Sequence, residues 1–168
     1  MEVLNALHIF ASICTTLPIL IGVSKEIMDA DILISLPKFK THGLTVMTGA
    51  IKNSYGILPG AQKANLHQIA GTPERFHALI VKVFRLRIPD LFIMDAVVGM
   101  EGNGPASPDL REIGLILAAD NGVAMDGVVA RMMGLDPSRL HFLQKAKALE
   151  LGEFDAQRIQ TEGDLPIL

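Results

Sequence analysis

The chain has 168 residues, of which 49% are apolar, and its 15 basic and 18 acidic side chains give a formal net charge of −3. This composition excludes a disordered chain, and the slightly acidic balance argues against a general nucleic-acid-binding protein, which needs a basic surface. The single cysteine, Cys14, excludes a disulfide framework, and also an iron–sulfur cluster or structural zinc held by thiolates of this chain alone. We therefore assign no cofactor and no metal, and we expect a reducing, cytoplasmic location.

The N-terminal region raises the question of a membrane span, because residues 3–24 carry no charged side chain. Asn5 and His8 interrupt this stretch, and the basic start of a signal peptide is missing. We therefore expect no membrane association. The pattern instead predicts an apolar helix over residues 3–14 and a buried strand over residues 17–23.

Apolar runs alternate with helix signals along the rest of the chain. Thr72 followed by Pro73 is a strong helix start, Asn121 or Asp120 caps a later helix, and Gly134 ends that helix. Strands are expected over residues 31–36, 90–98 and 113–119, a polar loop over 38–43, and helices over 24–30, 45–55, 61–70, 73–87, 121–133 and 136–152.

Strands that are apolar throughout and alternate with helices are typical of an α/β fold, with a mostly parallel sheet covered by helices on both faces. We predict one such domain over residues 1–168, with about four strands and a weakly ordered tail from 154 to 168. Four strands are few for such a sheet. The chain is therefore either a fragment or part of a homo-oligomer that buries residues 3–23.

Candidate ligand-binding residues follow the first of these strands, since ligands of open α/β sheets bind beyond the carboxyl ends of strands. Lys38, Lys40, Thr41 and His42 lie together directly after that strand. Lysine suits a carboxylate or a phosphate group, and Thr41 adds a neutral donor. The segment is interpreted as an anion-binding loop, although a loop that is merely solvated is the alternative.

The next helix is expected to end at Lys52 and Asn53, where Lys52 either joins the anion site or complements the helix dipole. Asp126 lies one to two turns into a later helix, facing either solvent or the same cleft. Both assignments depend on how the helices pack, which the sequence leaves open.

A second group of candidates surrounds the strand at residues 90–98. Asp95 lies inside this apolar strand, where a carboxylate needs a partner or a function. Glu101, Asn103 and Gly104 follow in a glycine-rich loop, and glycine permits a close approach to a ligand. The loop matches neither the P-loop pattern nor the dinucleotide-binding fingerprint.

Three segments in order, DILISLPKFKTHGLTVMTGAIKNSYGILPG, IPDLFIMDAVVGMEGNGP and GLILAADNGVAMDGVVARMMGLDP, resemble the domain-of-unknown-function family 362 over residues 27–140. Proteins of this family are often described as iron–sulfur-associated, which implies an iron–sulfur protein as a partner. Residues 1–16 are atypical of the family, and the ferredoxin-type cysteines of some members are absent. The resemblance places Lys38, Lys40, Thr41, His42, Lys52, Asn53, Asp95, Glu101, Asn103, Gly104 and Asp126 on the family motifs.

Three hypotheses follow. The chain is an enzyme acting on a small anionic molecule, with His42 and Asp95 as acid and base, the lysines binding the anion, and Glu101 and Asn103 orienting it. Alternatively, it is a non-catalytic module that works with an iron–sulfur protein, or an inactive truncated family member. The enzyme hypothesis predicts that His42 lies near Asp95 or Glu101 in one cleft.

Overall fold

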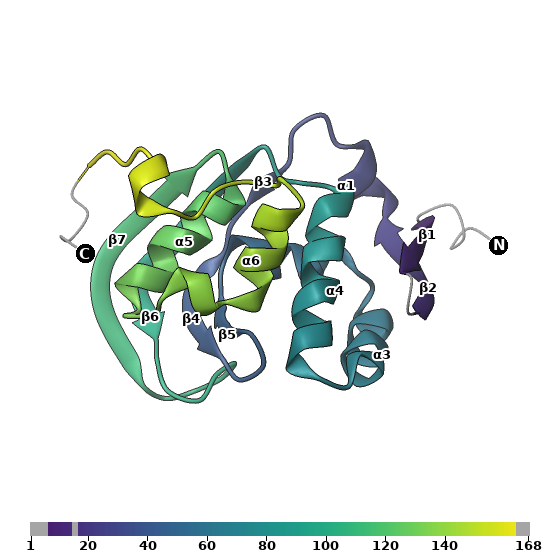
Figure 1. Ribbon diagram of the computed structural model, residues 1–168, viewed down its shortest axis with the longest axis horizontal. Helices are drawn as coiled ribbons and strands as arrows, with labels where there is room; N and C mark the ends of the chain where they lie inside the picture. The colour runs from purple at the N-terminus through teal and green to yellow at the C-terminus, as the bar shows by residue number, and fades with distance from the viewer. Residues whose placement is uncertain (1–6, 15–16, 164–168) are drawn as a thin grey trace.

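The computed structural model describes residues 7–14 and 17–163 of the chain (Figure 1). Groups of strands are followed by groups of helices along the described residues, together with three short 3-10 helices. In chain order the elements are β1 (Leu7–Cys14), β2 (Leu17–Ser24), α1 (Lys25–Asp29), β3 (Ile34–Ser35), β4 (Lys38–His42), β5 (Val46–Thr48), α2 (Ala50–Asn53), α3 (Gly60–Ala70), α4 (Pro73–Leu86), β6 (Leu91–Met100), β7 (Leu110–Ala119), α5 (Gly122–Met132) and α6 (His141–Ala148).

Strand β6 is at the centre of the main sheet, which confirms the predicted α/β class. Along one edge β6 pairs with β7 in antiparallel fashion. Its other edge pairs in parallel first with β3, where Ile34 is opposite Leu91, and then with β4, where Lys38 is opposite Asp95. The Pro37 carbonyl accepts the Asp95 N–H at 3.0 Å, so β3 and β4 form one strand line interrupted at Pro37. Strand β5 adds to β4 in antiparallel fashion.

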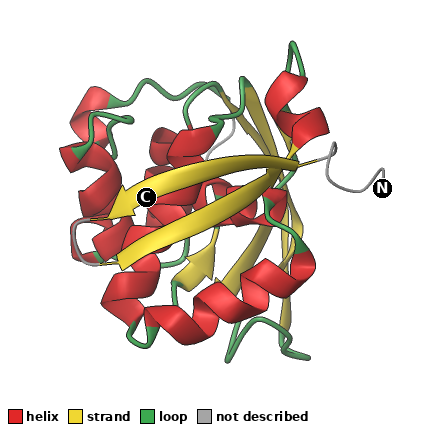
Figure 2. Cartoon of the chain, turned by 90° about the vertical axis from the view of Figure 1, so that its right-hand side faces the viewer, coloured by secondary structure: helices red, strands yellow, loops and turns green. Residues whose placement is uncertain are grey.

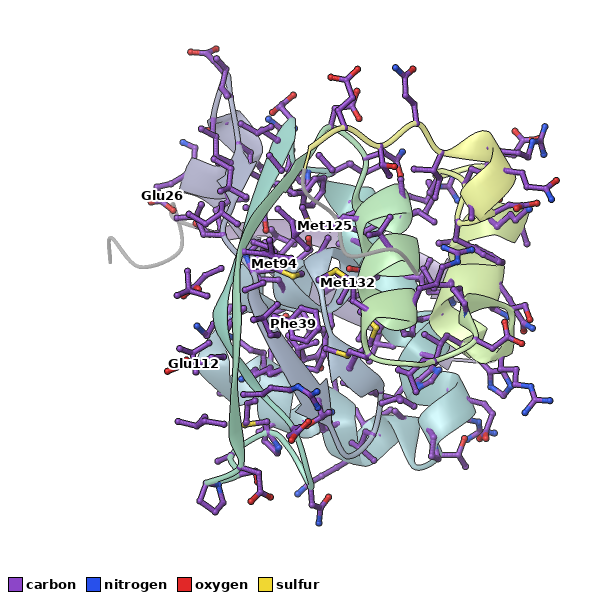
Figure 3. The ribbon with its side chains drawn as sticks, turned by 90° about the vertical axis from the view of Figure 1, so that its left-hand side faces the viewer. Glu26, Phe39, Met94, Glu112, Met125 and Met132 are labelled. Atoms are coloured by element: carbon purple, nitrogen blue, oxygen red, sulfur yellow. The ribbon has the colours of Figure 1, made fainter. Side chains whose placement is uncertain are left out.

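Helices cover one face of this sheet in the described part of the chain, rather than the two faces expected (Figures 2 and 3). Side chains of β6 alternate accordingly: Phe92, Met94 and Ala96 are buried, whereas Asp95 and Val97 are exposed. Figure 3 shows Phe39, Met94, Met125 and Met132 between the sheet and α5, with Glu112 pointing away. The opposite face presents apolar side chains to solvent, including Ile116, which is 69% exposed.

Helix α4 supplies much of the core, as its sequence predicts. Thr72 caps it by accepting the Arg75 N–H, and Phe76, Ile80 and Phe84 on one face are fully buried. Burying one such side chain contributes about 1.5–3 kcal/mol. The helix thereby fixes the position of the sheet that carries the candidate residues.

The N-terminal prediction was half wrong. Residues 17–23 do form a strand, β2, but residues 7–14 form strand β1 rather than a helix. The two strands pair antiparallel from Leu7 opposite Ser24 to Cys14 opposite Leu17, at the end of the molecule away from β7 (Figures 1 and 2). A short apolar run has no periodicity that separates helix from strand, so the pairing partner decides. No helix among the described residues is long and apolar enough to cross a membrane.

The polar segment 38–43 was also predicted wrongly, because it forms strand β4 instead of a loop. Its Phe39 is buried in the core, and the free edge of β6 supplies hydrogen-bond partners for its backbone. The helix expected over residues 45–55 begins only at Ala50, after strand β5. Both corrections move Lys40 and His42 from a loop onto the sheet.

Candidate functional site

Five basic side chains from three elements are close enough for their charges to act on one another. Lys40 and His42 come from β4, Lys52 from the last turn of α2, and Lys63 and His67 from one face of α3, four residues apart. We call these five residues the cationic cluster. All five are partly buried, and their charges act on one another.

Lys52 is the centre of this cluster. Burial lowers its pKa, and the charges of Lys40 and Lys63 lower that pKa further. Lys52 in turn helps to lower the pKa of His67, after the larger effect of burial. In the part of the chain that the structure describes, no carboxylate lies within 4.0 Å of the three lysines. The cluster therefore has an uncompensated positive charge.

His42 is held in a defined orientation by the turn that follows β4. Its Nδ1 atom accepts the Leu44 N–H at 3.1 Å and the Thr45 N–H at 3.4 Å. Burial, followed by the charges of Lys52, His67 and Lys40, lowers the pKa of His42 to about 4, so the ring is neutral at pH 7. A neutral ring whose Nδ1 is an acceptor bears its proton on Nε2.

Asp95 forms an ion pair with Lys38 on the neighbouring strand β4. Its Oδ2 atom lies 2.7 Å from Lys38 Nζ on the open face of the sheet, and its Oδ1 accepts the Val97 N–H. Both side chains are about half exposed, so water and salt screen this ion pair. The charged groups that shift the pKa of His42 are all basic, which gives no support to a His42–carboxylate pair. The acid and base roles of His42 and Asp95 stay predictions.

The glycine-rich loop after β6 meets the end of β4. Thr41 Oγ1 donates to the Gly102 carbonyl at 2.9 Å, and the Gly43 N–H donates to the Gly104 carbonyl at 3.2 Å. Glu101 instead forms an exposed ion pair with Arg111 on β7. Asn103 is exposed in this loop, and its role in ligand binding stays a prediction.

Replacing Gly104 with alanine is expected to lower the free energy of unfolding by about 2–3 kcal/mol. A Cβ atom at this position would overlap the Thr41 carbonyl oxygen, which belongs to the backbone and cannot move aside cheaply. Gly60→Ala is the matched control, because nothing lies within 4 Å of a Cβ placed there. Urea denaturation measures both variants, and equal stability of the two would contradict the close approach.

Asp126 and Asn53 serve the structure around the cluster. Asp126 is fully buried, rather than facing solvent or a cleft, and its carboxylate accepts the Ala50 N–H at 2.6 Å and the Ile51 N–H at 3.0 Å. Burial raises its pKa to about 7, while the two N–H groups act in the opposite direction. Asn53 Nδ2 donates to Ser35 Oγ at 3.0 Å. These contacts fix both ends of α2, and with it Lys52.

Lys63 and His67 were not predicted as site residues. The His67 ring stacks on Phe76 with centroids 4.0 Å apart, and Tyr55 Oη donates to the Lys63 carbonyl. The spacing of four residues on a predicted helix was the one available signal, since it places both side chains on the same face. That face meets Lys52 only through the packing of α3.

A pocket of about 820 Å³ lies elsewhere, between β7, α5 and residues 158–163. None of the predicted site residues lines it. Its Glu153 carboxylate is already bonded to Lys147 at 2.6 Å and Arg158 at 3.1 Å, contacts that secure the segment after α6. Among the described residues, no three His, Cys, Asp or Glu side chains are placed to hold a metal ion.

Comparison with known proteins agrees with the motifs in the sequence. The model of a domain of unknown function, DUF362, matches residues 13–131. The chain is 39% identical over 135 residues to the thylakoid-associated protein sll1697 of Synechocystis sp.; this alignment covers 80% of the chain and 42% of that relative, so the chain spans less than half of the relative's length. No solved structure matches the chain. The chain therefore belongs to the DUF362 family of proteins, whose function is unknown.

Proposed function

We propose that the protein binds a small anionic molecule, a carboxylate or a phosphate, at the cationic cluster. The observation that carries this proposal is that the charges of Lys40 and Lys63 act on the partly buried Lys52, while no carboxylate lies within 4.0 Å of these lysines among the described residues. The charged form of Lys52 costs stability in the free protein, because burial and the charges of Lys40 and Lys63 lower its pKa. A bound anion offsets that cost.

The position of the cluster supports the proposal. Lys40 and His42 lie at the carboxyl end of β4, the edge at which open α/β sheets bind ligands. Lysine side chains donate charge-assisted hydrogen bonds, and each such bond contributes about 1.5–3 kcal/mol. Two or three of these bonds are enough to hold a small anion.

The test is thermal unfolding in phosphate, sulfate or citrate against chloride at equal ionic strength. At a ligand concentration about 100 times Kd, binding adds about 2.7 kcal/mol, which raises the Tm by about 5–10 °C. The double variant Lys40→Met with Lys63→Met is expected to lose this increase.

Lys82→Met with Lys145→Met is the matched control, because it removes the same charge from α4 and α6, outside the cluster. The control is expected to keep the full increase in Tm. An equal increase in all three proteins would mean that the anions act as general salts, and it would refute binding at the cluster.

A further inference from the structure

We infer that the cationic cluster selects a doubly charged phosphate group, such as a phosphate monoester, with His42 as a neutral donor to one of its oxygens. This inference rests on the proposed function and names the chemical class of its ligand. It depends on two features of the cluster, its number of cations and the orientation of His42.

The charge of the cluster favours a dianion. The cluster contains three lysines, and the charges of Lys40 and Lys63 both act on Lys52. One carboxylate or phosphodiester offsets a single positive charge, whereas a phosphate monoester offsets two. A phosphate group also has three terminal oxygens, which can accept hydrogen bonds from several elements at once.

His42 supplies a donor without supplying more charge. Its Nδ1 accepts the N–H groups two and three residues further along the chain, the pattern by which an asparagine or aspartate side chain caps a turn. Moving the ring proton to Nδ1 would break both bonds. The Nε2–H group is therefore fixed in direction before any ligand arrives, which lowers the entropic cost of binding.

The surroundings of His42 explain why it stays neutral. The charged and titratable groups that act on it are Lys40 on its own strand, Lys52 on α2 and His67 on α3. His77 on α4 contacts the same turn, where its Nε2 lies 2.9 Å from the Leu44 carbonyl. Lys40, Lys52 and His67 are all basic, so each disfavours a positive charge on the His42 ring.

The first experiment is titration calorimetry of the 168-residue chain with glycerol phosphate, sulfate and acetate at about pH 5.5 and about pH 7.5. A phosphate monoester gains its second charge near pH 6, so its affinity is expected to rise about fourfold between these values. Sulfate is a dianion at both, and its affinity is expected to stay constant. Acetate is expected to bind at least about tenfold more weakly than either dianion at pH 7.5.

The outcomes separate the inference from the proposed function. Acetate binding as tightly as glycerol phosphate would overturn the inference but leave anion binding intact. No binding of any of the three anions would refute the proposed function itself. A lipid headgroup is another source of phosphate, and vesicles of phosphatidylglycerol, a phosphodiester lipid, test it. If the protein bound these vesicles more tightly than glycerol phosphate, the inference would also be overturned.

The second experiment tests His42 separately from the fold. In His42→Asn, the amide oxygen can still accept the Leu44 and Thr45 N–H groups, but no donor reaches the cluster. We expect an unchanged Tm and about tenfold weaker binding of glycerol phosphate. His42→Gln, which can restore a donor near the Nε2 position, is expected to regain part of that loss.

Nitrogen-15 NMR of the ring at pH 7 gives a readout that does not depend on ligand binding. The Nε2–H tautomer supports the inference. A charged ring, or a proton on Nδ1, would overturn it, and so would full affinity of His42→Asn.

Discussion

Replacing Asp126 with alanine is expected to lower the free energy of unfolding by about 3 kcal/mol. The carboxylate accepts two backbone N–H groups, from Ala50 and Ile51, in a region without solvent access. Removing it leaves both donors buried without a partner, and each unsatisfied buried group costs about 1–3 kcal/mol. Urea denaturation measures the change. Asp120→Ala, at an exposed position before α5, is the control and is expected to change stability by less than about 0.5 kcal/mol.

The same carboxylate is expected to make stability depend on pH. Burial raises the pKa of Asp126 to about 7, so the folded protein binds this proton more tightly than the unfolded chain does. The contribution of Asp126 is therefore full below about pH 4 and declines as the pH rises to about 7. Asp126→Asn keeps an oxygen acceptor and does not titrate. The free energy of unfolding of this variant is expected to be closer to that of wild type at pH 8 than at pH 5. If the difference between the two proteins were the same at both pH values, the raised pKa of Asp126 would be contradicted.

Replacing Lys52 with methionine is expected to change stability and binding in opposite directions. Burial and the charges of Lys40 and Lys63 lower the pKa of Lys52, so its charged form costs stability in the free protein. Methionine has a similar length and no charge, and the variant is expected to unfold at a higher urea concentration than wild type. At the same time it loses a charge-assisted hydrogen bond to the ligand, which corresponds to at least about a tenfold rise in Kd for phosphate.

Calorimetry and urea denaturation on the same samples measure the two effects. Lys145→Met on α6 is the control, because this exposed side chain lies outside the cluster. We expect it to change neither quantity. If Lys52→Met were less stable than wild type and bound phosphate normally, Lys52 would be a structural residue that complements the end of α2.

The contrast between Lys38 and Lys40 shows how far the sequence could specify the site. The two residues are two apart in a basic segment, and nothing local separates their roles. In the structure the pairing of β4 with β6 is irregular between them. Lys38 meets Asp95 on the open face of the sheet, whereas Lys40 joins Lys52 near His42. A change in strand register is a property of the pair of strands, so one strand's sequence cannot reveal it.

Asp126 makes the same point for a buried residue. Its position one to two turns into a helix was predictable, but its surroundings were not. The carboxylate meets α2 only because α5 packs beside that short helix, more than 70 residues away in the chain. A titratable group in a helix therefore has no defined role until its neighbours are known.

The sequence by itself determined the strands β6 and β7, the helices α3, α4 and α5, the cap of α4 at Thr72, and the family. These features depend on local signals, namely the period of the apolar residues and the capping side chains. The tertiary structure decided that β1 and β4 are strands, that helices cover one face of the sheet in the described residues, and that Lys63 and His67 complete the cationic cluster. Strand pairing and helix packing join residues far apart in the chain. Residues 38–42 have a composition that favours a loop, but they form a strand because their backbone pairs with the edge of β6.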